Sequence, residues 1–128
     1  MDQTRLVIPL RPGARASAQG WVAALASDRA DERARSERRT GIARQSWLVA
    51  DGGRDLLIGT IEAGDVERAM RLLAISMDPF DLWFKRSFGA LTGVELNDPP
   101  ATDIAALLAA YATDSARAPE GARASPIA

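Results

Sequence analysis

Side chains that could take part in chemistry are found in three short segments rich in β-branched and apolar residues. Arg5 lies in the first segment, Gln45 and Trp47 in the second, and Thr60 and Glu62 in the third. A few polar groups that converge among apolar side chains are typical of a small-molecule site. In such a site Glu62 would act as acid or base, while Arg5 or Gln45 would orient an oxyanion. The alternative is an ordinary Arg5–Glu62 ion pair at the ends of two strands, which contributes little.

An aromatic stripe follows later in the chain. The three phenylalanines, Phe80, Phe84 and Phe88, are spaced four residues apart, and Trp83 and Lys85 flank the middle one. This spacing predicts a helix whose phenylalanine face is buried. We expect Trp83 and Lys85 to border any space beneath the helix and to contact a ligand there. Lys85 has two interpretations: a Schiff-base amine, or the solvated lysine that is far more common on helices.

Composition removes several classes of site. The chain of 128 residues has no cysteine and no histidine, so thiolate and imidazole chemistry, the usual zinc ligands and the usual haem ligand are absent. We therefore expect no cofactor, and a metal would need a cage of carboxylates and carbonyls. With 16 basic and 17 acidic side chains, the chain is nearly neutral. A neutral balance argues against a nucleic-acid-binding protein, which must neutralise phosphates.

The start of the chain gives an expectation of location. The first ten residues, MDQTRLVIPL, have no basic region before their short apolar run, so they do not resemble a signal peptide. The sequence has no apolar run long enough to span a membrane. We expect a cytoplasmic protein with no membrane partner.

The spacing of apolar residues predicts a chain with both strands and helices. Asp65 and Asp78 each stand at a predicted helix N-terminus, Pro79 takes a first helical position, and Gly93 follows a last turn, as capping preferences require. The predicted elements are strand 4–10, helix 14–39, strands 43–50 and 54–63, helices 65–77 and 78–93, a short strand at 94–96, and a helix at 102–112 before a flexible tail at 113–128.

The sequence Asp-Gly-Gly-Arg at 51–54 predicts a two-residue hairpin turn between the second and third strands. A turn closed by Asp and Arg places Gln45 opposite Thr60. Trp47 and Glu62 then share the face of these two residues, because alternate residues of a strand point the same way. If the first and third strands are antiparallel neighbours, Arg5 joins this cluster near Glu62.

The order of elements matches the ferredoxin-like, split βαβ pattern, with the aromatic helix inserted before the last strand. In such a fold the two long helices cover one face of the sheet. The other face must be covered by the aromatic helix, by a second subunit, or by both, since a large exposed apolar face marks an interface or a ligand site.

Several segments carry a family likeness: SW in the second strand, the DGG hairpin, EAGD before the second long helix, and DPFDLWFK followed by LTGVEL. Over about residues 4–100 the chain resembles a family of uncharacterised bacterial proteins within the dimeric α/β-barrel superfamily. The resemblance implies a ferredoxin-like domain, residues 1–112, that forms a homodimer sheet to sheet with a small cavity between each sheet and its lid. It implies no particular reaction, because a fold alone does not define a function.

Three functions remain open from the sequence. The first is a homodimeric protein that binds a small molecule in a pocket on the sheet face, under the aromatic helix. The second is a cofactor-independent isomerase or monooxygenase that uses Glu62 with Arg5 or Gln45. The third is a non-catalytic dimerisation module whose cavity is packed shut. The shape and lining of the sheet-face cavity distinguish the three.

Overall fold

The structure, a computed structural model, describes residues 1–51 and 53–96. The helix predicted at 102–112, the tail at 113–128 and the domain boundary at 112 lie outside the described residues. The described elements make the chain an α+β protein with one three-stranded sheet and four helices. In chain order they are β1 (Asp2–Pro9), α1 (Arg15–Ala26), α2 (Ala30–Thr40), β2 (Ile42–Asp51), β3 (Asp55–Ala63), α3 (Val66–Ile75) and α4 (Pro79–Thr92).

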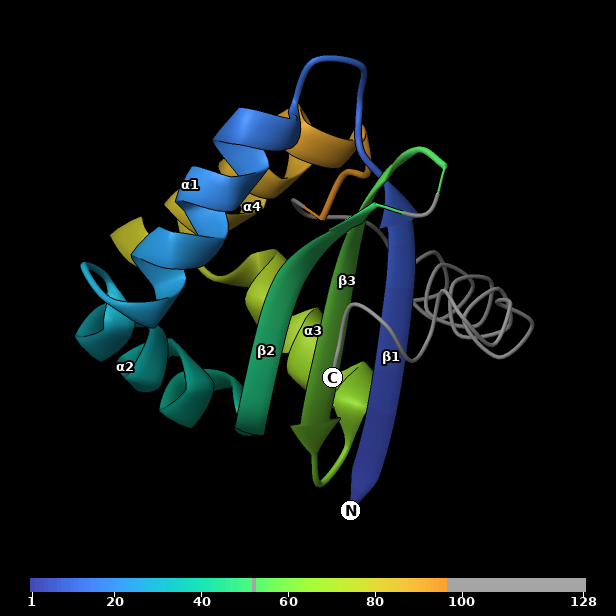
Figure 1. The fold of residues 1–128 in the computed structure, drawn as a ribbon. Helices are drawn as coiled ribbons and strands as arrows, with labels where there is room; N and C mark the ends of the chain where they lie inside the picture. Colours follow the sequence, from blue (N-terminus) through green and yellow to red (C-terminus); the bar gives the residue numbers. More distant parts are fainter. Residues whose placement is uncertain (52, 97–128) are drawn as a thin grey trace.

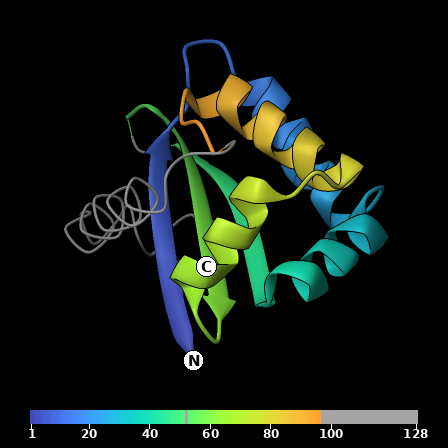
Figure 2. The same ribbon diagram turned by 180° about the vertical axis from the view of Figure 1, so that it is seen from behind.

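The sheet has the order β1-β3-β2, and β3 pairs antiparallel with both neighbours. The helices leave one of its faces uncovered within the described part of the chain. In Figure 1, α3 lies behind the sheet, α1 and α2 lie along its β2 edge, and α4 lies behind α1. From the other side, Figure 2 shows α3 crossing the sheet and α4 running beside α1. The apolar core fills the space between the sheet and these helices.

The hairpin between β2 and β3 differs from the prediction by one residue. Asp51 pairs with Asp55, so three residues rather than two separate the paired positions. Gly53 adopts a φ of 97°, as three-residue hairpin loops with a left-handed residue require. Trp47 is therefore opposite Gly59, where the predicted two-residue turn would have placed Ile58. A slip of one residue turns every side chain of β2 to the other face relative to β3.

The predicted helix at 14–39 is wrong in one respect: it is broken into α1 and α2. The break falls at Ser27, whose hydroxyl donates to the Ala23 carbonyl at 2.8 Å. Such a bond competes with the regular ladder of backbone hydrogen bonds. Gly41 ends α2 in the left-handed conformation, as glycine commonly does after a last helical turn.

The predicted caps of the last two helices are confirmed. Asp65 accepts a hydrogen bond from the backbone N–H of Arg68, and Asp78 accepts one from Phe80, each at 3.0 Å. Gly93 ends α4 with a φ of 79°. The short strand predicted at 94–96 does not form; Val94 and Leu96 instead pack against the core, so side-chain burial fixes this segment.

Candidate functional site

The register divides the predicted polar cluster between the two faces of the sheet. Arg5 is opposite Thr60, and Glu62 is two residues further along β3, so these three share the face that no described helix covers. Gln45 and Trp47 point to the helix-covered face, opposite Ile61 and Gly59. The prediction that all five residues form one cluster is wrong, and its cause is the extra residue in the hairpin loop.

On the uncovered face, Glu62 is held by a different arginine from the one expected. Arg44 donates from Nε and Nη2 to the two carboxylate oxygens of Glu62, at 3.0 and 3.3 Å. The Arg44 side chain is 75% exposed, so solvent screens this pair and it contributes little to stability. Glu62 is thus part of a surface ion pair, and it lies across the sheet from Gln45.

On the covered face, Trp47 lies in the middle of an aromatic cluster. Its ring centroid is 5.4 Å from that of Trp21, 6.0 Å from Phe84 and 5.7 Å from Phe88, in each case with an edge against a face. Gly59 makes this position available, because a Cβ built there would be 2.3 Å from the Trp47 ring. The glycine inside a strand was the sequence signal for this close approach.

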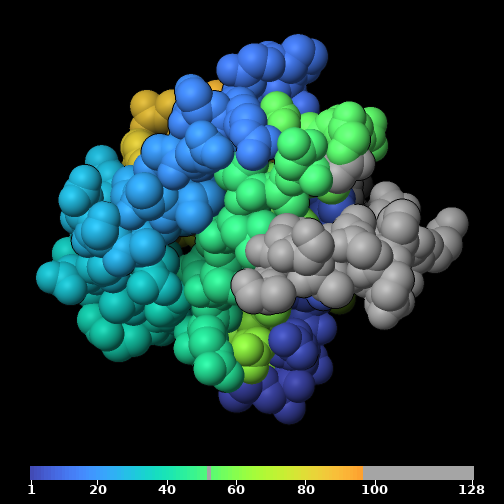
Figure 3. Space-filling view, viewed as in Figure 1, coloured from blue at the N-terminus to red at the C-terminus, as the bar shows by residue number. Residues whose placement is uncertain are grey.

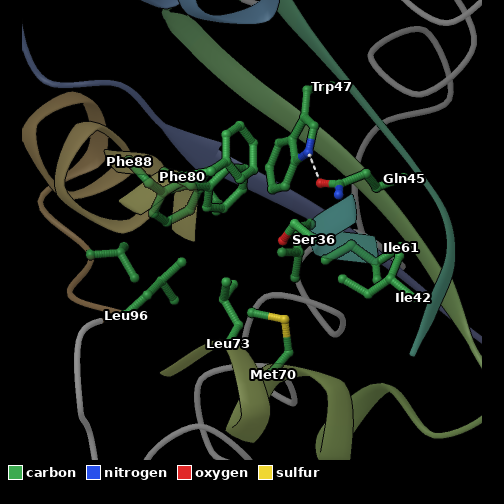
Figure 4. A pocket seen from close by; sticks show the side chains of 14 residues that line it. Ser36, Ile42, Gln45, Trp47, Ile61, Met70, Leu73, Phe80, Phe88 and Leu96 are labelled. Carbon is green, nitrogen blue, oxygen red and sulfur yellow. Dashed lines mark hydrogen bonds between the residues drawn. The ribbon is translucent and has the colours of Figure 1, made fainter. Parts of the chain in front are cut away.

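Gln45 is the polar partner of this tryptophan. The Trp47 indole N–H donates to Oε1 of Gln45 at 2.8 Å, as Figure 4 shows. The two residues are two apart on β2, so their side chains leave the strand on the same face.

An interior cavity lies between the sheet and helices α3 and α4 (Figure 4). Its walls are almost entirely apolar; among the described residues that line it, the Gln45 amide, the Trp47 indole N–H and the Ser36 hydroxyl are the polar side-chain groups. Its volume is about 30 Å³, room for about two water molecules, whereas an apolar cavity of about 150 Å³ holds benzene. As it stands, the cavity is too small for a ring.

A second space opens at the surface, where α1 and α2 meet β2. We call it the β2-edge hollow. It has a volume of about 280 Å³. Figure 3 shows the side chains of α1 and α2 lying against those of β2 on this side of the molecule. Gln45 and Trp47 line the hollow as well as the interior cavity, so they separate the two spaces. The hollow is lined by Val22, Leu25, Ala26, Arg33, Gln45, Ser46 and Trp47.

Lys85 is not the solvated lysine that was the common expectation. Its side chain is 1% exposed, and Nζ donates to the carbonyls of Ala74 and Ser76 at 2.8 and 3.0 Å. These are carbonyls at the C-terminal end of α3, where a helix leaves acceptors unpaired and favours a cation. Lys85 thus ties α4 to α3, and this hydrogen bonding does not leave a free amine for a Schiff base.

The residue that sequence reasoning missed is Asp81, which is fully buried. Its two carboxylate oxygens accept hydrogen bonds from the hydroxyls of Ser36 and Ser76, both at 2.5 Å, and Arg39 lies 3.2 Å away. These partners come from α2 and from the segment after α3, so the carboxylate links three helices. In the sequence, Asp81 and Lys85 are four residues apart, which is also the spacing of an ordinary ion pair on a helix surface. The spacing therefore gives no sign that either residue is buried.

Trp83 borders neither the interior cavity nor the hollow. It is half-buried, packs against Phe80 at a centroid distance of 5.6 Å, and carries the Arg29 guanidinium 4.1 Å above its ring. It anchors the start of α2 to α4 and does not contact the site formed by Gln45 and Trp47.

Residues 1–51 and 53–96 contain neither a metal cage nor a membrane-spanning helix. No group of three acidic side chains there is arranged to hold a metal ion. None of the helices in those residues has both the length and the apolar character needed to cross a membrane. A shallow groove of about 450 Å³ on the outer side of α4 is lined by Arg11, Leu82, Lys85, Arg86, Gly89, Ala90 and Glu95.

No protein-family model, curated protein or solved structure matches this chain. The resemblance to the dimeric α/β-barrel proteins therefore stays a prediction from the sequence.

Proposed function

We propose that this protein binds a small, mainly apolar molecule at the pair formed by Gln45 and Trp47. One observation carries the proposal: the two side chains line both the interior cavity and the β2-edge hollow. Apolar walls with a few convergent polar groups are the usual surroundings of a small-molecule ligand.

The hollow is where the ligand first binds. Its volume of about 280 Å³ is near the lower end for ligand sites, which suits a molecule with a single ring. Trp47 offers a ring face or edge for stacking, and the aliphatic side chains of α1 provide apolar contacts. The interior cavity of about 30 Å³ is too small for the ring of a ligand, so the ligand stays in the hollow.

The test is a titration with single-ring aromatic compounds, in which binding is monitored through the NMR signal of the Trp47 indole N–H. This signal is identified by its absence in a Trp47→Phe variant. Ala26 lines the hollow and Ala23, on the same helix, does not; both are exposed. Ala26→Phe should block the hollow and weaken binding at least ten-fold, whereas Ala23→Phe should leave the affinity unchanged. The proposal fails if no compound at millimolar concentration shifts the signal, or if both variants bind alike.

A catalytic role is not proposed. The acid–base group predicted for it, Glu62, is on the opposite face of the sheet from Gln45 and is paired with Arg44. An isomerase or monooxygenase of the expected kind needs its base and its oxyanion donors around one substrate. Arg5 shares the face of Glu62, but neither residue lines any of the three spaces described above.

We also propose that the protein is a homodimer that associates through the uncovered face of the sheet. Val7 and Leu48 are partly exposed on that face, on either side of their cross-strand neighbour Ile58, which is buried within the single chain. The antiparallel order β1-β3-β2 is compatible with the ferredoxin-like arrangement that the resemblance implies, in which two sheets pack together. Light scattering should give twice the 13.7 kDa mass of the chain, and Leu48→Lys should halve it. A wild-type mass of one chain at micromolar concentration would refute this proposal.

A further inference from the structure

We infer that the ligand of the β2-edge hollow carries a neutral hydrogen-bond acceptor, such as a ketone, aldehyde or ester carbonyl, beside its apolar ring. The inference rests on the proposed function and names the class of molecule. Its starting point is the bond between Trp47 and Gln45. An indole N–H can only donate, so the Gln45 atom that faces it at 2.8 Å must be the oxygen. The amide is thereby oriented with its NH₂ group available to the ligand.

The amide NH₂ supplies two donors and no acceptor. Among the described residues, Trp47 is the one hydrogen-bond partner of the Gln45 side chain. Apolar side chains form most of the surrounding wall, where a hydrogen bond is stronger than in water and a ligand without an acceptor leaves the donors unmatched. The site therefore favours a molecule that offers an acceptor.

Arg33 decides the charge of that acceptor. It also lines the hollow, where its Nε donates to the Leu25 carbonyl at 2.9 Å and its Nη1 pairs with Glu37 at 3.2 Å. The Arg33 and Glu37 side chains are only 27% and 15% exposed, so the pair is partly shielded from solvent. A carboxylate placed in the hollow would meet a cation that Glu37 already neutralises. A neutral carbonyl is not repelled by the Glu37 carboxylate, and it does not bring the cost of desolvating an anion.

Three probes of similar size test the inference: acetophenone, ethylbenzene and benzoate. All three carry one ring, and they differ in offering a neutral acceptor, no acceptor, or an anionic acceptor. In wild-type protein, acetophenone should bind about five- to ten-fold more tightly than ethylbenzene, the effect of one added hydrogen bond, and more tightly than benzoate. Binding is followed at the Trp47 indole N–H.

Gln45→Glu provides the matched variant. The new carboxylate keeps an oxygen for the Trp47 N–H but replaces the NH₂ donor by an acceptor. The preference for acetophenone over ethylbenzene, measured within this variant, should disappear because the carboxylate offers no donor to the ketone. Gln3→Glu makes the same chemical change at an exposed position of β1, across the sheet, and should leave the preference intact.

The outcomes separate this inference from the proposed function. If ethylbenzene or benzoate binds wild-type protein as tightly as acetophenone, the inference is overturned, and this comparison needs no variant to fold. It is also overturned if the preference survives in Gln45→Glu. In both cases binding at the hollow still stands. If none of the three probes shifts the Trp47 signal, the proposed function fails and the inference fails with it.

Discussion

Replacing Gly59 by alanine tests the register on which the site depends. The added Cβ would be 2.3, 2.6 and 2.7 Å from three atoms of the Trp47 ring, whereas carbon atoms in contact are about 3.5–4.0 Å apart. The ring must therefore move by about 1 Å or more. It cannot do so freely, because the rings of Trp21, Phe84 and Phe88 surround it.

The size of the effect follows from two opposing terms. Overpacking of a well-packed core costs about 1–3 kcal/mol. Alanine also restricts the unfolded chain more than glycine does, which returns about 0.4–1 kcal/mol. We expect Gly59→Ala to lower the free energy of unfolding by about 1.5 kcal/mol, a large part of the total for a domain of this size.

Urea denaturation measures this change as a lower midpoint with an unchanged slope. The control is Gly64→Ala, since a Cβ at Gly64 would meet no atom within 4 Å and should change stability by less than about 0.5 kcal/mol. In a Trp47→Leu background the clash is gone, and Gly59→Ala should then cost close to nothing. If the cost is the same in both backgrounds, the tryptophan does not lie across Gly59 and the register is wrong.

Three further changes probe the helices. Asp81→Ala leaves the buried Ser36 hydroxyl and the partly buried Ser76 hydroxyl without their acceptor and should cost about 3 kcal/mol or more in urea denaturation. A loss below about 1 kcal/mol would contradict the burial of the carboxylate. Lys85→Met removes the donor to two carbonyls and should lower the free energy of unfolding by about 2 kcal/mol. The control Arg86→Met, at an exposed neighbour, should change it by less than about 0.5 kcal/mol. Equal costs would show that Lys85 is solvated. Phe84→Ala should cost about 3–5 kcal/mol and Trp83→Ala clearly less. The reason is that Phe84 is 5% exposed in the core, whereas Trp83 is only half-buried. A lower melting temperature for Trp83→Ala than for Phe84→Ala would refute this account of α4.

Local signals in the sequence were sufficient for most of the elements. Asp65, Asp78 and Gly93 mark helix ends through hydrogen bonds with residues two to four positions away, and such signals are visible in a single chain. The phenylalanine stripe of α4 was also predicted correctly as buried. The position of α4 was not predicted correctly. The helix packs on Trp21 and Trp47 from the same side as the other helices and does not cover the other face of the sheet.

The site was harder to predict because it depends on one residue in a loop. A glycine-rich turn permits two- and three-residue hairpins, and the choice decides whether Gln45 lies on the same face of the sheet as Glu62 or on the face that carries the core. Gly59 could have settled it, since a large ring needs a partner without a side chain. Asp81 offers no comparable signal, because its partner Ser36 is 45 residues away and becomes a neighbour only through the packing of α2 on α4.

The most direct test of the central claim is the position of acetophenone bound to the protein. Nuclear Overhauser effects between the ligand and the protein, or a crystal soaked in the compound, would locate it. We predict that its ring contacts Trp47 and the side chains of Val22 and Leu25, with the carbonyl oxygen within about 3.2 Å of the Gln45 amide nitrogen. Acetophenone bound on the uncovered face of the sheet or in the groove on α4, with the β2-edge hollow empty, would contradict the claim.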